Sequence, residues 1–121
     1  MIAFGTDGIR GQFNTELTIE TAVKLGKYLG NKNKGKKIVV GEDTRISSPI
    51  LANAIAVGAS SMGADVYLMG VCPTPALAYV VSLDKFVAGV MISASHNPYF
   101  DNGLKVFNHR GMKLSKKEEE E

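Results

Sequence analysis

Cysteine is nearly absent from this sequence, and so are the features that direct a chain to a membrane or out of the cell. Cys72 is the single cysteine, so no disulfide can form within the chain, which agrees with a reducing compartment. No apolar run approaches the roughly 20 residues that a membrane-spanning helix needs. The first residues lack the basic segment and apolar stretch of a secretion signal. We therefore expect a cytoplasmic chain with no membrane partner.

A strong charge of one sign is also missing. The formal net charge is only +2 at pH 7. Part of the basic character lies in one short turn, which contains Lys32, Lys34, Lys36 and Lys37. No aromatic residue is interleaved there and no second basic cluster supports it, so a solvated turn is favoured over a nucleic-acid site. We therefore expect no nucleic-acid partner.

Three common motifs of nucleotide binding and hydrolysis are absent as well. The sequence has no GxxxxGK[ST] and no GxGxxG that opens a helix, so nucleotide binding has little support. It has no GxSxG segment, and His96 and His109 are its only histidines. A serine-hydrolase triad therefore has little support too.

Alternating helix and strand patterns fill most of the 121 residues, a length typical of one domain. Apolar residues at helical spacing predict helices over residues 18–30, 48–63 and 74–81. Short apolar runs predict strands over residues 37–41, 64–69, 86–92 and 103–107, after an irregular start. This order predicts an α/β fold with three layers, α/β/α, and a four-stranded, mostly parallel mixed sheet covered by helices.

Local signals define several element ends. Thr18 can cap the first helix, and Ser48 can accept hydrogen bonds from the first-turn amides of the second. Gly63 can close the second helix in a left-handed conformation. An Asp101-Asn102-Gly103 turn is expected to lead into the last strand.

The last residues resemble the beginning of another helix. Ser115 is followed three residues later by Glu118, which is the capping-box pattern. A helix begun here and not continued predicts that residues 1–121 are a piece of a longer protein. A frayed, charged tail is the alternative interpretation.

Polar loops follow three of the predicted strands directly, at residues 42–45, 71–74 and 93–97. In an open parallel sheet, ligands bind beyond the carboxyl ends of the strands, so these loops are candidates for one shared rim. Two of them lead into helix N-termini, whose free amides favour anions. Arg45 is expected to brace the loops through an ion pair with Asp43 or Asp7.

Ser95 is the most informative hydroxyl on this rim. One interpretation is a serine that carries a phosphoryl group, which would need cations and a proton-transfer group nearby. Lys105 and Arg10 are candidate partners. The residue types alone leave another interpretation open, in which Ser95 is a turn serine, His96 a hydrogen-bonded loop histidine and Lys105 an exposed strand lysine.

Four segments together resemble the α-D-phosphohexomutase superfamily, in its order and at its approximate spacing. They are FGTDGIRG at 4–11, GEDTR at 41–45 with Ser47-Ser48, PTPA at 73–76, and SASHNP at 93–98. FGTDGIRG and ISASHNP are most similar to the phosphoglucosamine mutase branch. The resemblance covers residues 1–121 but only the first of that family's four domains.

The resemblance implies a role for several residues. Ser95 would be phosphorylated and would exchange its phosphoryl group with a hexose phosphate, through a hexose bisphosphate. Lys105 would perform acid/base chemistry beside it, Arg10 would contact the phosphoserine or share the proton handling, and His96 would orient the loop. The implied catalytic residues are thus Ser95, Lys105, Arg10 and His96, and the implied substrate-binding residues are Thr6, Arg10, Ser95, His96, Asn97 and Lys105.

The resemblance also implies Mg²⁺, bound to the phosphate oxygen of Ser95. The other metal ligands would lie in an Asp-Gly-Asp-type loop that this sequence lacks, so we expect the chain alone to be inactive and to need the remaining domains of the same enzyme. Two alternatives stay open. One is phosphomannomutase or phosphoglucomutase specificity, and the other is a non-catalytic anion-binding or assembly module that self-associates.

Overall fold

The computed structural model describes residues 9–15, 17–83, 86–94 and 100–109, with only the backbone at residues 9 and 10. Three helices and five strands lie in these ranges. The helices are α1 (Ile19–Lys32), α2 (Ser48–Ser61) and α3 (Thr74–Leu83). The strands are β1 (Ile9–Gln12), β2 (Lys37–Glu42), β3 (Asp65–Val71), β4 (Phe86–Ile92) and β5 (Asp101–Asn108).

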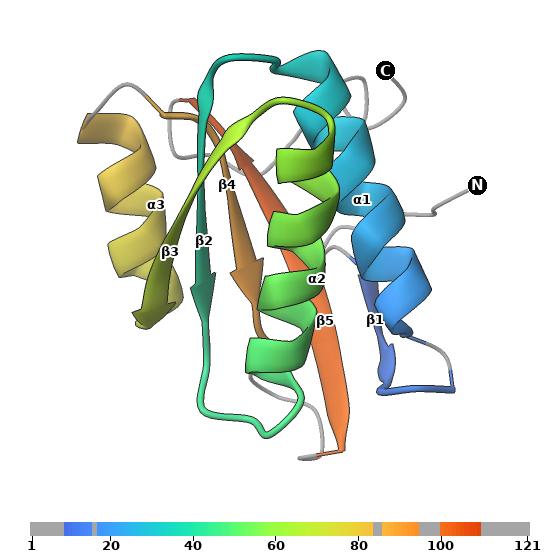
Figure 1. The fold of residues 1–121 in the computed structure, drawn as a ribbon. Helices are drawn as coiled ribbons and strands as arrows, with labels where there is room; N and C mark the ends of the chain where they lie inside the picture. The colour runs from blue at the N-terminus through green and yellow to red at the C-terminus, as the bar shows by residue number, and fades with distance from the viewer. Residues whose placement is uncertain (1–8, 16, 84–85, 95–99, 110–121) are drawn as a thin grey trace.

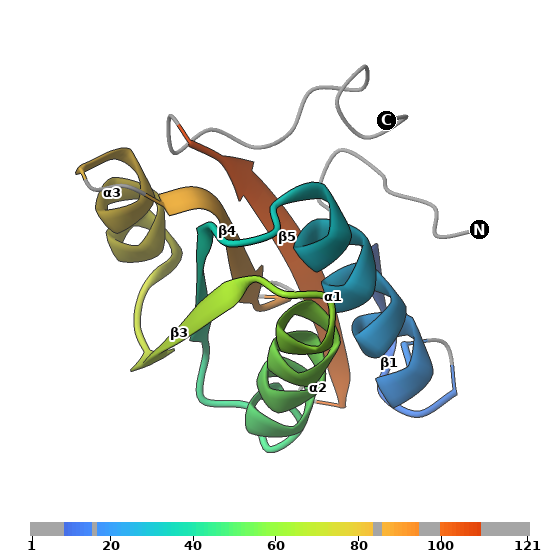
Figure 2. The same cartoon turned by 45° about the horizontal axis from the view of Figure 1, so that its top comes forward.

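The strands form one mixed sheet in the order β1-β5-β4-β2-β3. β2 pairs in parallel with β3 and β4, whereas β5 is antiparallel to both β4 and β1. Helices α1 and α2 lie side by side on one face of the sheet, and α3 lies on the other (Figures 1 and 2). The predicted three-layer α/β/α fold is confirmed, with five strands in the sheet instead of four.

The additional strand is β1, in the stretch that the sequence predicted to be irregular. Its four residues, IRGQ, contain one large apolar side chain and form no apolar run, and their extended conformation comes from pairing with β5 far along the chain. Ile9 lies opposite Leu104 and Gln12 opposite Asp101. The same pairing makes the predicted Asp101-Asn102-Gly103 turn wrong, because β5 already begins at Asp101.

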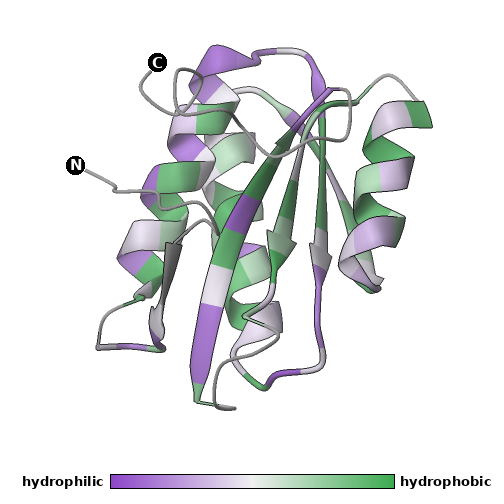
Figure 3. Cartoon of the chain, turned by 180° about the vertical axis from the view of Figure 1, so that it is seen from behind, coloured by the Kyte–Doolittle hydropathy of each residue, from purple (hydrophilic) through white to green (hydrophobic). Residues whose placement is uncertain are grey.

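Each face of the sheet has its own apolar core. On the first face, α1 and α2 cover a cluster that includes Leu25, Leu51, Ile55, Val90 and Leu104. On the second face, α3 packs on a smaller cluster that consists of Val39, Leu77, Val81, Met91 and Phe107. Figure 3 shows this second face with α3, and the β4 sequence FVAGVMI is apolar throughout. β4 contributes apolar side chains to both faces of the sheet, which is typical of a strand covered by helices on both sides.

Two of the predicted helix signals are confirmed. The Thr18 hydroxyl accepts a hydrogen bond from the Thr21 amide at 3.2 Å and caps α1. Gly63 has φ +102° just beyond the end of α2, a conformation that favours glycine.

The prediction that Ser48 caps α2 is wrong. Ser47 occupies the N-cap position without a side-chain cap bond, and Ser48 is the first helical residue. The Ser48 hydroxyl instead donates a short hydrogen bond to a carboxylate oxygen of Asp43. Pro49 follows in the first turn, where its missing N–H does no harm.

The capping box at residues 114–118 lies outside the described residues, so the predicted C-terminal helix stays a prediction. None of the helices in the described ranges is long and apolar enough to cross a membrane.

Glycines set the distance between α1 and α2. A Cβ added to Gly58 of α2 would lie 2.4 Å from the carbonyl oxygen of Val23, and one added to Gly26 of α1 would lie 2.3 Å from that of Ile55. At Gly30 the nearest atom would be the carbonyl oxygen of Ala59, at 2.4 Å. These contacts involve backbone atoms, which cannot rotate away. Gly30 is therefore a packing residue, and α1 continues past it to Lys32.

We expect Gly58→Ala to lower the free energy of unfolding of the chain by about 1–3 kcal/mol, because the added methyl overpacks the helix contact. Helix propensity alone would raise stability by about 1 kcal/mol, so the sign of the change identifies the cause. Urea denaturation measures it. Ser60→Ala, at an exposed site of the same helix, is the control and should shift stability by less than about 0.5 kcal/mol. A Gly58→Ala chain as stable as this control would contradict the close contact.

Candidate functional site

The carboxyl ends of β2, β3 and β4 meet at one edge of the sheet, which is the lower end in Figure 1. The Asp43 amide donates a hydrogen bond to the Ile92 carbonyl at 3.0 Å, and the Cys72 amide donates to the Glu42 carbonyl at 3.0 Å. The chain segments that follow these three strands therefore start side by side, as the sequence predicted. We call this side of the sheet the carboxyl edge.

Strands β1, β5 and β4 bring the segments with the predicted catalytic residues together. In the ladders, Arg10 lies opposite Gly103, and Met91 lies opposite Lys105. Just beyond β4, the Ser93 amide donates to the Gly103 carbonyl at 2.9 Å. The backbone that leads to residue 95 therefore runs next to the strand of Lys105, which in turn runs next to the strand of Arg10.

Lys105 is buried, with 8% of its surface exposed. Its neighbours Leu104 and Val106 pack in the core under α1 and α2, so the alternation of the strand places Lys105 on the opposite face, with Met91. Lys105 therefore faces away from Leu104 and Val106. The alternative of an exposed strand lysine is wrong. Lysine is rarely this buried without a structural or functional reason.

Several predicted site residues lie outside the described residues. These are Thr6, Ser95, His96, Asn97 and Pro98, and for Arg10 only the backbone is described. Their roles stay predictions. The described chain ends at Ala94 on one side of this segment and resumes at Phe100 on the other.

Arg45 braces the carboxyl edge, as the sequence predicted. One guanidinium nitrogen, Nη1, lies 2.5 Å from Oδ2 of Asp43 in an ion pair, and the Arg45 amide donates to Oδ1 of the same carboxylate at 3.0 Å. The other nitrogen, Nη2, donates to the carbonyl of Ala94 at 2.6 Å. Arg45 therefore ties the loop after β2 to the residue that precedes Ser95.

The two acidic residues at the end of β2 have pKa values displaced in opposite directions. Burial acts to raise the pKa of Asp43, but hydrogen bonds from Ser48 and Arg45 and the charge of Arg45 outweigh burial and lower it. Burial and the neighbouring charge of Asp43 raise the pKa of Glu42. Asp43 is thus held as the anion that Arg45 needs.

Cys72 is a poor nucleophile at this edge. Its thiol pKa is raised, first by burial and then by the nearby charge of Glu42, against a lowering by a backbone hydrogen bond. Because the thiolate is the reactive form, a raised pKa makes the sulfur less reactive at neutral pH.

Asn102 is a site residue that the sequence interpretation assigned to a turn. It is fully buried. Its Nδ2 donates to the hydroxyls of Ser47 at 2.8 Å and Ser48 at 2.9 Å, and its Oδ1 accepts from the Gly103 amide at 2.9 Å. One sequence signal pointed to this cluster. The Ser47-Ser48 pair is part of the family resemblance, and neither hydroxyl is used in a described cap of α2.

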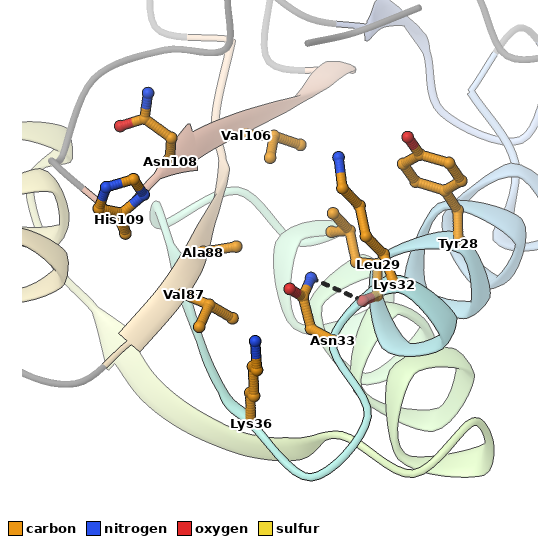
Figure 4. Close-up of a pocket in the computed structure, with 10 residues that line it drawn as sticks. All are labelled: Tyr28, Leu29, Lys32, Asn33, Lys36, Val87, Ala88, Val106, Asn108 and His109. Atoms are coloured by element: carbon orange, nitrogen blue, oxygen red, sulfur yellow. Dashed lines mark hydrogen bonds between the residues drawn. The ribbon is translucent and has the colours of Figure 1, made fainter. Parts of the chain in front are cut away.

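A separate pocket of about 290 Å³ lies at the opposite edge of the sheet, by the beginning of β4 and the end of β5 (Figure 4). Asn33, at the end of α1, donates to the Leu29 carbonyl at 2.9 Å on its wall. The lining also includes Lys32, Lys36, Val87, Asn108 and His109. No predicted catalytic residue within the described ranges lines this pocket, so it is not part of the carboxyl edge.

The described part of the chain contains no group of three or more His, Cys, Asp or Glu side chains that could hold a metal ion. The described residues therefore supply no complete set of protein ligands for Mg²⁺, and the expected metal site stays a prediction.

Comparison with known proteins adds to this geometry. The chain is 54% identical over 121 residues to a phosphoglucosamine mutase of Caldicellulosiruptor bescii, covering 97% of this chain and 27% of the relative. It is 50% identical over 123 residues to that of Streptococcus pneumoniae, with 98% of this chain and 27% of the relative covered. The chain thus spans about a quarter of the length of these relatives.

Solved structures of similar proteins share the fold. A phosphomannomutase-family protein of Thermus thermophilus matches with a TM-score of 0.88 and 36% identity, over 97% of this chain and 28% of that protein. A phosphoglucomutase/phosphomannomutase family protein of Burkholderia thailandensis matches with a TM-score of 0.81 and 30% identity, over 92% of this chain and 27% of that protein.

The sequence profile of the phosphoglucomutase/phosphomannomutase family, alpha/beta/alpha domain I, matches residues 1–121. Because this profile matches residues 1–121 and a relative is 54% identical to the chain, the chain belongs to the phosphoglucomutase/phosphomannomutase family, in which it corresponds to domain I.

Proposed function

We propose that this chain is the phosphoserine-bearing domain of a phosphohexomutase, which moves phosphate between C6 and C1 of a hexose phosphate. Glucosamine phosphate is the favoured substrate, because relatives about 50% identical are named phosphoglucosamine mutases. Since the chain covers 27% of these relatives, the complete reaction belongs to a longer protein that we call the parent enzyme. The single cysteine favours a cytoplasmic location.

One observation carries this proposal: the three strands that bear or lead to the predicted catalytic residues are consecutive in the sheet. Arg10 lies in β1, Lys105 in β5, and β4 leads through Ala94 to Ser95. Phosphoryl transfer depends mainly on positioning and on charge stabilisation. A buried lysine next to the backbone that leads to a phosphoserine supports both requirements.

In the proposed reaction, phosphoserine 95 gives its phosphoryl group to the free hydroxyl of a hexose monophosphate. The bond from phosphorus to the sugar oxygen forms as the bond to the seryl oxygen breaks, and the product is a hexose bisphosphate. Lys105 gives a proton to the seryl oxygen, and a base of the parent enzyme takes the proton of the sugar hydroxyl. After the bisphosphate reorients, Ser95 attacks the other phosphate and Lys105 takes its proton back. The protonated base then gives its proton to the second sugar oxygen, which becomes the free hydroxyl.

Mg²⁺ would neutralise phosphate charge in this reaction. A phosphoserine oxygen is the expected ligand from this chain, and carboxylates of the remaining domains would supply the others. We therefore propose that the chain alone is inactive.

A different sugar specificity is the nearest alternative. Phosphomannomutase-family structures are 30–36% identical to the chain, below the identity to phosphoglucosamine mutases. Rates of the parent enzyme with glucosamine, glucose and mannose phosphates would separate these activities.

We expect Ser95→Ala to reduce the kcat of the parent enzyme by roughly 10³-fold or more, because the acceptor of the phosphoryl group is removed. The measurement is the interconversion of glucosamine 6-phosphate and glucosamine 1-phosphate. Ser93→Ala is the control, because the described contact of Ser93 with β5 uses its backbone amide, and it should retain activity within about tenfold. A Ser95→Ala enzyme with the wild-type rate would remove Ser95 from the mechanism.

We expect Lys105→Met to lower the parent kcat by about 10²–10⁴-fold, the usual contribution of a proton-transfer group. The unfolding free energy is followed as well, so that a loss of kcat can be separated from a loss of the fold. Steady-state kinetics and denaturant unfolding measure the two effects. Lys36→Met, at the exposed opposite edge, is the control. A loss below tenfold would count against the proposed role.

An assembly module is a second candidate function, and the exposed strand β3 favours it. Among the described strands, β3 pairs only with β2, and its Tyr67, Leu68 and Val71 are 47%, 53% and 64% exposed. An apolar edge strand of this kind can pair with another chain.

If the edge strand β3 mediates assembly, the isolated chain should self-associate as its concentration rises, and Leu68→Lys should keep it monomeric. Size-exclusion chromatography with light scattering at several concentrations measures the mass. Lys24, exposed on α1, offers a control as Lys24→Leu, which should not increase association through β3. A wild-type chain that is monomeric at every concentration would exclude the assembly function.

A further inference from the structure

A chain of buried and part-buried hydrogen bonds crosses the carboxyl edge. Asn102 Nδ2 donates to the Ser48 hydroxyl at 2.9 Å, and Ser48 donates to Oδ1 of Asp43. Oδ2 of Asp43 accepts from Nη1 of Arg45 at 2.5 Å, and Nη2 of Arg45 donates to the Ala94 carbonyl at 2.6 Å. We call this series, from Asn102 through Ser48, Asp43 and Arg45 to the Ala94 carbonyl, the relay.

The two ends of the relay adjoin the two proposed catalytic groups. Ala94 directly precedes Ser95 in the sequence. At the other end, Asn102 accepts from the Gly103 amide, two residues before Lys105. The Ser93 amide also donates to the Gly103 carbonyl at 2.9 Å, so backbone and side-chain contacts connect the same two segments.

Asn102 is suited to this place by its mixture of donors and acceptor. Its two Nδ2 hydrogens go to Ser47 and Ser48, and its Oδ1 takes the Gly103 amide. Ser48 has one hydrogen, which it gives to Asp43, so it can only accept from Asn102. The directions of these bonds are therefore fixed along this part of the relay.

The burial of the relay makes each of these bonds matter. Asn102 and Ser48 are 0% exposed, and the side chains of Arg45 and Asp43 are 14% and 19% exposed. Hydrogen bonds in such surroundings are stronger than in water, and an unmade bond is costly. Apolar packing could fill the same space, but it would not set the position of one carbonyl oxygen.

We propose that Asn102 and Ser48 are positioning residues that hold the backbone before Ser95 at a fixed separation from the strand of Lys105. They act through Asp43 and Arg45 and touch no substrate. This inference rests on the proposed function, in which Ser95 exchanges the phosphoryl group and Lys105 the proton. That reaction needs the seryl oxygen and the ammonium to stay close in both halves, and the relay would serve it by fixing the backbone at Ala94.

The chain offers a matched pair of variants to test the relay. Ser47 and Ser48 are adjacent and buried, and each hydroxyl accepts one hydrogen from Asn102. Only Ser48 passes the connection on to Asp43 in the described contacts. Ser47→Ala and Ser48→Ala therefore remove the same atom and one Asn102 bond each, but only the second interrupts the relay.

In the parent enzyme we expect Ser48→Ala to lower kcat by about tenfold or more, with KM for the hexose phosphate within about twofold. Ser47→Ala should keep kcat within about twofold. Thermal unfolding of both variants, measured in parallel, tests whether kcat follows stability. Single-turnover loss of phosphate from phosphoserine 95 on addition of glucosamine 6-phosphate locates the defect in the transfer step.

Two outcomes would overturn the inference. One is an unchanged kcat in Ser48→Ala. The other is an equal loss of kcat and of stability in both variants, which would show a structural role alone. If Ser48→Ala does not fold, Arg45→Lys carries the same test, because a lysine keeps the charge beside Asp43 without the forked guanidinium that also reaches Ala94; an unchanged kcat there would equally refute the relay.

The Ser95→Ala enzyme separates this inference from the proposed function. If Ser95→Ala is inactive and Ser48→Ala is fully active, only the relay is wrong. If Ser95→Ala is active, the phosphoserine function itself is wrong.

Discussion

The antiparallel pairing of β4 with β5 is the constraint on which the proposed site depends. β4 carries the chain toward Ser95, and β5 returns with Lys105 opposite Met91. In a sheet, a register slip of one residue would turn every side chain of the strand to the other face. Such a slip would drive the ammonium of Lys105 into the core under α1 and α2 and remove Leu104 from it. The apolar core thus fixes which face the lysine occupies.

The close contact of α1 with α2 supports this register from the other face of the sheet. Glycines at the contact let the two helices approach until added Cβ atoms would meet backbone carbonyls. The paired helices then present one continuous apolar surface to β2, β4 and β5, through residues such as Leu25 and Ile55. Because packed interiors deform little, the helices restrict how far β4 and β5 can shift relative to each other. The rigidity of the carboxyl edge therefore begins on the far side of the sheet from Lys105.

Local chemistry predicted much of this fold, and non-local pairing accounts for the differences. Thr18 and the apolar run of β4 carry their signals within a few residues, so the helix start and the strand were predicted correctly. β1 could not be predicted, because its conformation depends on a partner strand about 90 positions away, with Arg10 opposite Gly103. In the site, an ion pair of Arg45 with either Asp43 or Asp7 was predicted, and the structure shows the pair with Asp43. Asn102 was not, because asparagine before glycine is typical of a turn, and only the folded chain places it beside Ser47 and Ser48.

The division of the chain between apolar cores and a polar edge follows from what each must do. Apolar contacts on the two faces of the sheet are non-directional, so they can hold strands together without setting the position of a single atom. The proposed function requires fixed atomic positions at the carboxyl edge, because phosphoryl transfer tolerates little misplacement of the reacting atoms. The carboxamide of Asn102 and the ion pair of Asp43 with Arg45 fix atomic positions there through directional hydrogen bonds. These bonds offset the cost of burying the polar groups. In the proposed function, catalytic groups of other domains must meet Ser95 in one fixed place, and such an edge suits that requirement.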